Sequence, residues 1–103
     1  MRTMLIANAE SIEKFLRKNR DVAKWMEAWA EAVTDAEWQS LQDVRIDYPF
    51  ADGVATKSGV IVTVFNVKGN SYRLLTLISY QRQVVRILNI LTHAEYSKGK
   101  WKG

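Results

Sequence analysis

Residues 60–78, VIVTVFNVKGNSYRLLTLI, decide the fold of this chain. The two flanks of the stretch are rich in β-branched and aromatic residues, which favour the extended backbone of a sheet. Between the flanks, Lys68, Gly69 and Asn70 are residue types that tolerate the backbone angles of a tight turn. The stretch therefore predicts a β-hairpin.

A second turn and a third strand are predicted after the hairpin. Residues 81–83 (QRQ) interrupt the apolar pattern, and residues 84–91 (VVRILNIL) resume it. Three consecutive strands joined by short turns predict an antiparallel meander. Because these strands are almost continuously apolar, we expect helices to cover one face of the sheet well and the other face to be only partly polar.

The first third of the chain shows mainly helical periodicity. Residues 4–6 (MLI) predict a short strand, followed by Asn8 as the N-cap of a helix that ends before Asn19. The next helix is predicted from apolar residues that recur with a 3.6-residue period, namely Val22, Trp25, Met26, Trp29 and Val33. We interpret both tryptophans as core residues rather than as a platform for stacking bases.

A short third helix is predicted from a capping box. Thr34 and Glu37 have the spacing of this motif, in which each side chain satisfies a free backbone N–H of the other residue. The helix that follows would carry Trp38 and Leu41. With helices first and strands last, the order of elements predicts an α+β fold with N-terminal helices packed on a small antiparallel β-meander.

The segment between this helix and the hairpin is predicted to be extended. Apolar residues alternate over residues 44–48, which is the period of a strand. Pro49 cannot donate to a continued ladder, and Asp52 and Gly53 are typical turn residues. We therefore expect an extended connector that ends in a turn.

Length and composition limit what the chain can be. It has 103 residues, which suits one small domain, and no cysteine, which excludes disulfides and thiolate metal sites. One histidine cannot build a zinc site of the usual kinds, and the sequence lacks a glycine-rich phosphate loop. No apolar run approaches a membrane span. We expect a cytoplasmic protein without a metal, a cofactor or a membrane partner.

Positive charge is concentrated in the second half of the chain. Residues 1–56 carry seven Lys or Arg against ten Asp or Glu, whereas residues 57–103 carry eight against one. Such asymmetry favours a polyanionic partner such as RNA. It is also compatible with a basic face that only keeps the protein dissolved, or that binds an acidic segment of a protein partner.

The basic half contains the side chains that metal-free RNA cleavage requires. This reaction needs a base for the 2′-hydroxyl proton, positive charge for the phosphorane, and an acid for the leaving 5′-oxygen. The residues of these types are Arg73, Arg86, His93, Tyr96, Lys98 and Lys100. They make the region after residue 72 the candidate site.

Each of these residues also has a purely structural interpretation. A lone histidine beside a helix start is often structural, although its ordinary pKa suits acid or base work. Tyr96 lies three residues after His93, on the same side of one helical turn, and could simply pack there. Arg73 could be a solvated strand residue, and Lys98 and Lys100 part of a solvated tail.

The last twelve residues begin with another capping box. Thr92 and Glu95 have the required spacing and predict a single helical turn. Residues 97–102 (SKGKWK) follow as a basic, flexible tail with one exposed aromatic side chain. The sequence contains no internal repeat and no linker, so we expect one domain over residues 1–103.

Two motifs resemble a known family. Residues 64–74 (VFNVKGNSYRL) and 91–96 (LTHAEY) resemble the FN-x-x-GN-x-x-R and THxEY motifs of the HigB family of bacterial toxins. Trp38 and residues 47–52 (DYPFAD) are also similar to that family. HigB proteins belong to the RelE-like superfamily of type II toxin–antitoxin systems.

The resemblance implies a fold, an activity and partners. The fold is RelE-like, with N-terminal helices behind a small antiparallel sheet. The activity is that of an mRNA interferase, which cuts messages on the translating ribosome. A HigA antitoxin with a helix-turn-helix domain neutralises the toxin, and the complex represses its own operon, so operator DNA would be bound only through the antitoxin.

The resemblance also assigns residues to the site. Asn66, Asn70 and Arg73 match the first motif, and His93, Glu95 and Tyr96 match the second. On this basis we expect Arg73, His93 and Tyr96 to be catalytic, and Asn70, Arg86, Lys98 and Lys100 to bind RNA. Glu95 is left as a cap, and Asn70 could be only a turn residue with positive φ. The alternative function is a non-catalytic RNA-binding module, or an inactive toxin that acts only in operon control.

Overall fold

The computed structural model describes residues 4–103, and five strands and four helices lie within this range. The strands are β1 (Leu5–Ala7), β2 (Asp52–Ala55), β3 (Ile61–Val67), β4 (Tyr72–Ser79) and β5 (Val84–Thr92). The helices are α1 (Glu13–Lys18), α2 (Arg20–Asp35), α3 (Leu41–Asp47) and α4 (His93–Ser97), with short 3₁₀ segments η1 (Ala9–Ile12) and η2 (Lys100–Lys102).

The predicted meander is confirmed. β3 pairs antiparallel with β4, and β4 pairs antiparallel with β5. In the β3–β4 turn, Lys68 and Gly69 adopt positive φ angles of 52° and 67°. Asn70 is not among the positive-φ residues, so the prediction of such a backbone angle for it is wrong. The positive φ angles of this turn occur two and one residues before Asn70.

The sheet is wider than the meander. In the described residues its order is β1-β5-β4-β3-β2, with β1 parallel to β5 and the other pairs antiparallel. The predicted short strand at residues 4–6 is confirmed as β1. The amide of Asn8, however, donates to the carbonyl of Ile87 at 2.8 Å, and this side chain caps no helix. Asn8 occupies the N-cap position of η1, as predicted. The prediction that its side chain caps the helix is wrong, because the amide ties the N-terminal segment to β5 instead.

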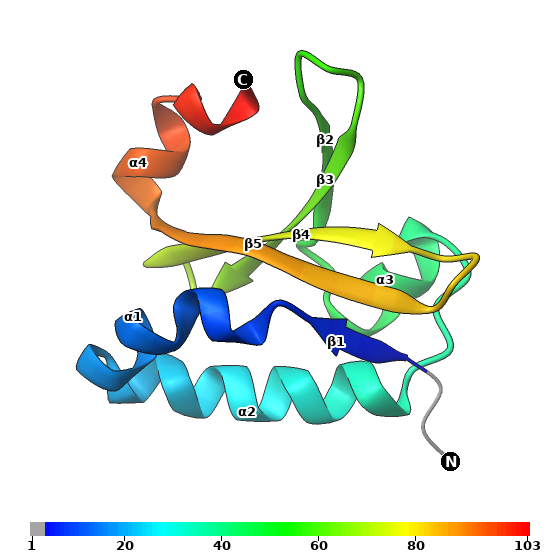
Figure 1. Ribbon diagram of the computed structural model, residues 1–103, viewed down its shortest axis with the longest axis horizontal. Coiled ribbons are helices and arrows are strands. Elements are labelled where there is room, and N and C mark those ends of the chain that lie inside the picture. The colour runs from blue at the N-terminus through cyan, green and yellow to red at the C-terminus, as the bar shows by residue number, and fades with distance from the viewer. Residues whose placement is uncertain (1–3) are drawn as a thin grey trace.

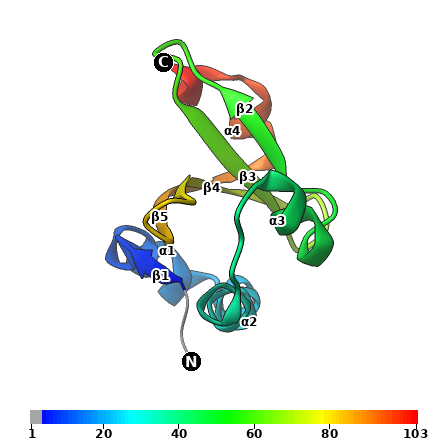
Figure 2. The same cartoon turned by 90° about the vertical axis from the view of Figure 1, so that its right-hand side faces the viewer.

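The two faces of the sheet are covered differently (Figures 1 and 2). α1 and α2 lie on one side, which we call the helix face, and α4 with the C-terminus lies on the other, which we call the open face. Buried residues of the helix face form the larger core, centred on Phe65, which packs against the rings of Trp29, Trp38 and Tyr48. Trp29 is 1% exposed and Trp25 is only partly buried against this core. The architecture is the predicted α+β fold.

The open face carries a smaller apolar cluster. Its buried members are Val62, Val64 and Leu75, and Tyr96 and Trp101 from the C-terminal segment pack against them. The backbone of η2 also bonds to the β2–β3 connection, since Lys57 N donates to Lys102 O at 2.9 Å. In Figure 2 the C-terminus accordingly lies beside the tip of that connection.

The region between α2 and β2 differs from the prediction. Thr34 lies inside α2, where its hydroxyl donates to the carbonyl of Glu31 at 3.1 Å, so the capping box with Glu37 does not form. Trp38 precedes α3, which begins only at Leu41. The predicted start of the third helix and the predicted place of Trp38 in it are both wrong, because α2 continues through Asp35 and includes Thr34.

Residues 41–47 are helical rather than extended. Val44 is buried and Tyr48 is partly buried, whereas Ile46 is 77% exposed. The helix spacing from Val44 to Tyr48 thus determines which side chains face the core, and the apparent alternation is accidental. Asp52 and Gly53, predicted as a turn, instead begin β2.

Candidate active site

The candidate site lies on the open face and is organised around Arg73. In the β3–β4–β5 register, Asn66 stands opposite Arg73, and Arg73 stands opposite Leu91. Residues opposite each other in an antiparallel sheet point to the same face. Arg73 is only 8% exposed, so a guanidinium charge is held in a largely dehydrated position. A buried charge of this kind requires several partners.

The partners of Arg73 come from the β3–β4 turn and the start of α4. Its Nη1 donates to the carbonyls of Tyr72 at 3.1 Å and Asn70 at 3.3 Å. Its Nη2 lies 3.2 Å from the Oδ1 of Asn70 and 3.2 Å from the Nδ1 of His93. The structure therefore joins Asn70 and Arg73 with His93, which lies 20 residues after Arg73 in the sequence.

The contact between Arg73 and His93 is a hydrogen bond in one tautomer of the imidazole. A guanidinium has only donors, so the bond can form only when the Nδ1 of His93 is an acceptor with a free lone pair. That tautomer carries its ring proton on Nε2. His93 is the first residue of α4 and its side chain is exposed, while its backbone N–H donates to the carbonyl of Ser71 at 3.2 Å. The ring is thus presented to solvent from a fixed backbone.

Two aromatic rings are stacked above the guanidinium. The Cζ of Arg73 lies 5.5 Å from the ring centroid of Tyr96, a cation–π distance. The ring of Trp101 stacks on Tyr96 with centroids 5.1 Å apart and an interplanar angle of 16°, and its Nε1 donates to the Tyr96 carbonyl at 3.0 Å. Trp101 is partly buried, so the prediction of an exposed aromatic in the tail is wrong, because the turn at Gly99 folds the tail back onto α4.

Tyr96 keeps its proton in this environment. Partial burial raises the pKa of its hydroxyl above the ordinary value of 10.0, and the carboxylate of Asp52 raises it further, while Arg73 acts in the opposite direction. The hydroxyl is therefore protonated at neutral pH. It can donate a proton or a hydrogen bond but is a poor base.

The second predicted capping box is confirmed. Thr92 Oγ1 accepts from the backbone N–H of Glu95 at 3.1 Å, and Glu95 Oε1 accepts from that of Thr92 at 2.9 Å. These bonds lower the pKa of the Glu95 carboxyl below its ordinary value of 4.5. The box fixes where α4 begins and hence where His93 and Tyr96 are placed.

The predicted basic residues divide into two groups. Lys98 and Lys100 line one hollow of about 290 Å³ together with Leu91, Glu95 and Trp101. The hollow adjoins a group that we call the Arg73 cluster, which consists of Asn70, Arg73, His93, Tyr96 and Trp101. Arg86 is instead opposite Leu77, five residues before Leu91 in β5. Because β5 has an irregularity beside Leu75 and Thr76, the distance is counted along β4, where Leu77 is four residues from Arg73. At about 3.3 Å per residue this places Arg86 roughly 13 Å from the row that contains Arg73. The fold brings together all the predicted site residues except Arg86.

Two residues near the cluster were missing from the predicted site. Phe50 and Asn66 line a hollow of about 330 Å³ with Gly69 and Asn70. Asn66 matched the first motif but received no role. For Phe50, the available signal was its position directly after Pro49, because proline at the second position of a turn leaves its neighbour at the tip.

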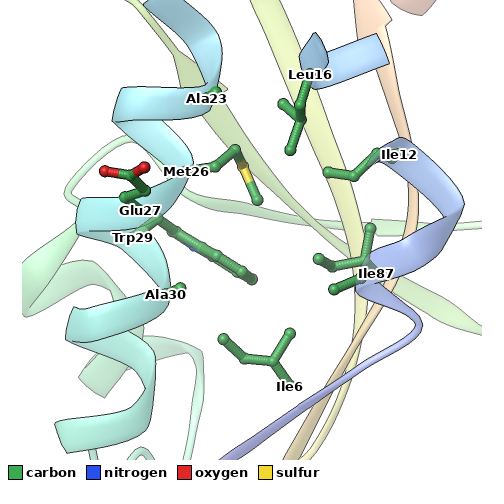
Figure 3. Close-up of a pocket in the computed structure, with 10 residues that line it drawn as sticks. Ile6, Ile12, Leu16, Ala23, Met26, Glu27, Trp29, Ala30 and Ile87 are labelled. Carbon is green, nitrogen blue, oxygen red and sulfur yellow. The ribbon is translucent and has the colours of Figure 1, made fainter. Parts of the chain in front are cut away.

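An apolar hollow lies on the helix face. It has a volume of about 360 Å³ and lies between α2, η1 and β5 (Figure 3). Among its lining residues only Glu27 is titratable, and the others are apolar, including Ile6, Met26 and Ile87. This hollow has no pair of groups that could move protons.

The described residues show neither a metal cluster nor a membrane helix. Within residues 4–103, no group of three or more His, Cys, Asp and Glu side chains could hold a metal ion. Over the same range, no helix has the length and apolar character needed to cross a membrane.

Comparison with known proteins gives one family. The model of the HigB_toxin family, described as the RelE-like toxic component of a toxin-antitoxin system, matches residues 22–99. This range runs from the first turn of α2 to the glycine after α4, and it includes every residue of the Arg73 cluster except Trp101. Comparison with curated proteins gives no match.

Proposed function

The chain belongs to the HigB family of RelE-like toxins, and from this premise we propose that it is a metal-independent endoribonuclease that cleaves mRNA. The observation that carries the proposal is the convergence of a buried guanidinium, an imidazole and a protonated phenol at one point of the open face. These are the three chemical types that phosphodiester transfer requires.

Arg73 supplies the positive charge in the proposed reaction. Attack of the 2′-oxygen on phosphorus produces a dianionic phosphorane, and fixed donors stabilise such charge more strongly in a dehydrated site than in water. Arg73 is 8% exposed, and three oxygen acceptors hold its guanidinium. Little reorganisation is then needed when the phosphate arrives.

His93 and Tyr96 move the protons. When a bound phosphate replaces His93 as a partner of Arg73, the lone pair of His93 Nδ1 becomes free to accept the proton of the 2′-hydroxyl. The 2′-oxygen bonds to phosphorus, the bond from phosphorus to the 5′-oxygen breaks, and Tyr96 donates its proton to that oxygen. The products are a 2′,3′-cyclic phosphate and a 5′-hydroxyl.

The remaining assignments concern binding and partners. Lys98 and Lys100 are proposed to hold the RNA backbone beside the cluster, and Asn70 to hold Arg73 and contact RNA. Family membership implies an antitoxin, and we propose the HigA type with a helix-turn-helix domain, through which alone operator DNA would be bound. The proposed place of action is the translating ribosome in the cytoplasm.

Growth on expression tests the proposed function. Expression of the wild type is expected to arrest growth, and co-expression of the antitoxin to restore it. Arg73→Ala and His93→Ala should abolish the arrest, whereas Arg82→Ala, which removes an exposed arginine in the β4–β5 turn, should not. Circular dichroism of the purified variants checks that they are folded. Arrest by folded Arg73→Ala and His93→Ala proteins would overturn the assigned site.

A further inference from the structure

Phe50 is a large apolar side chain held out in solvent. It is 79% exposed, the highest value among the large exposed hydrophobic residues of the described chain. Its neighbours behave differently, since Ala51 is 2% exposed and Tyr48 packs against Phe65 of the core. Single exposed apolar side chains are common on protein surfaces, so exposure alone assigns no role to Phe50. The backbone that holds the ring and the side chains beside it are the informative features.

The backbone around Phe50 is fixed on both sides. The N–H of Ala51 donates to the carbonyl of Tyr48 at 2.9 Å, which closes a turn with Pro49 and Phe50 at its centre. Nε of Arg45 donates to the carbonyl of Ala51 at 2.8 Å, and its Nη2 lies 3.3 Å from the carboxylate of Asp52. The phenyl ring is therefore presented by a braced turn rather than by a loose loop.

The surroundings of the ring are polar and adjoin the Arg73 cluster. Phe50 shares its hollow of about 330 Å³ with Asn66, Gly69 and Asn70. Asn66 stands opposite Arg73 in the sheet, and Asn70 contacts its guanidinium. Gly69 would place no Cβ within 4 Å of another residue, so this wall of the hollow is open.

A flat ring beside two amides fits one class of ligand well. Unpaired bases of RNA stack on aromatic side chains and form hydrogen bonds through their edges, and an asparagine amide offers both a donor and an acceptor. An apolar segment of a protein partner would match the ring but would offer no partner to the Asn66 amide or to the Nδ2 of Asn70. The composition of the hollow thus favours a nucleobase.

We propose that Phe50, Asn66 and Asn70 form a nucleobase-binding site that positions a nucleotide of the RNA next to Arg73. This inference rests on the proposed function, because it identifies how that same site selects and orients its substrate. Phe50 supplies the stacking surface. The Asn66 amide and the Nδ2 of Asn70, whose Oδ1 accepts from Arg73, contact the base edge.

The test uses a single-stranded RNA that cannot be cleaved. All its 2′-hydroxyls are methylated, and one base is the fluorescent 2-aminopurine. Because stacking of one base contributes about 1–3 kcal/mol, Phe50→Ala should weaken binding roughly 5- to 150-fold. Phe50→Trp should retain the affinity, and Phe50→Leu, which is apolar but not aromatic, should not. Ile46→Ala, at an equally exposed apolar position outside the hollow, is the matched control.

The outcomes separate this proposal from the proposed function. Equal RNA affinity of Phe50→Ala and wild type, or no RNA binding by wild type, overturns the nucleobase site. A loss of antitoxin binding by Phe50→Ala with RNA affinity unchanged also overturns it and makes the turn a protein contact. RNA binding that depends on Phe50 without any cleavage of unmodified mRNA on translating ribosomes supports the nucleobase site and overturns the proposed nuclease.

Discussion

The helix face and the open face of the same sheet differ in the polarity of the side chains that they carry. On the helix face, apolar side chains pack almost without polar partners, and Phe65, Leu74 and Trp29 are each at most 1% exposed. On the open face, a small apolar cluster borders a buried arginine, an exposed histidine and a stacked pair of aromatics. The strand period of two allows one strand to serve both purposes, since Arg73 and Leu74 are adjacent in β4 but point to opposite faces.

The largest expected effect contrasts two neighbouring leucines. Leu74→Ala removes a side chain from the main core and Leu75→Ala one from the open-face cluster, although both are nearly fully buried. Leu→Ala costs about 2–5 kcal/mol depending on how far the cavity collapses. We expect Leu74→Ala near the upper end and Leu75→Ala near the lower end. Chemical denaturation measures both, and a larger cost for Leu75→Ala would contradict the contrast.

The second prediction separates proton transfer by His93 from its contact with Arg73. His93→Gln keeps an acceptor that can face Arg73 but cannot take up a proton at neutral pH. Cleavage should fall about 100-fold or more, since general acid–base catalysis contributes roughly 10²–10⁴. The unfolding free energy should change little, because the His93 side chain is exposed. Unchanged cleavage of RNA by this variant would exclude His93 as a proton carrier.

A smaller effect, on the free energy of unfolding, is expected when the ring of Trp101 is removed from Tyr96. Trp101→Ala removes the ring stacked on Tyr96 and the hydrogen bond to its carbonyl. An aromatic pair and one hydrogen bond each contribute about 1 kcal/mol, so the unfolding free energy should fall by roughly 1–2 kcal/mol. Trp101→Phe keeps only the stack and should lose about half as much. No loss in either variant would mean that the folded-back tail does not stabilise the open face.

The smallest expected effect is the pH dependence of the α4 cap. The pKa of Glu95 is lower in the folded protein than its ordinary value of 4.5, so the carboxylate stabilises the fold above pH 4.5. This contribution is lost as the pH falls below 4.5 and through the lowered folded value. The melting temperature of Glu95→Gln should therefore be below that of wild type at pH 7 and converge with it in acid. A difference that persists unchanged at pH 3 would contradict this role.

Sequence periodicity predicted the elements whose packing is local. The meander and α2 followed from runs of β-branched residues and from the 3.6-residue period, and the Thr92–Glu95 box marked the start of α4. The period failed at α3, where Val44, Ile46 and Tyr48 suggest a strand. The core uses only Val44 and Tyr48, and the exposed Ile46 is the residue that misled the prediction.

Features that depend on distant contacts could not be predicted. The parallel pairing of β1 with β5, and the Asn8 amide on Ile87, join segments about 80 residues apart. The sequence identified the types of side chain in the site but not that Arg73 would be buried, that Trp101 would cover Tyr96, or that Arg86 would lie apart. Phe50 was missed because exposure, not residue type, is what distinguishes it.

Mapping RNA ends tests the central claim most directly, namely that the Arg73 cluster on the open face cleaves RNA. After brief expression, mRNA is examined for 2′,3′-cyclic phosphate ends in cells with wild type, Arg73→Ala or Arg82→Ala. We predict such ends with wild type and with Arg82→Ala, and none above background with folded Arg73→Ala. Ends that persist with Arg73→Ala, or that are missing with wild type, would contradict the account.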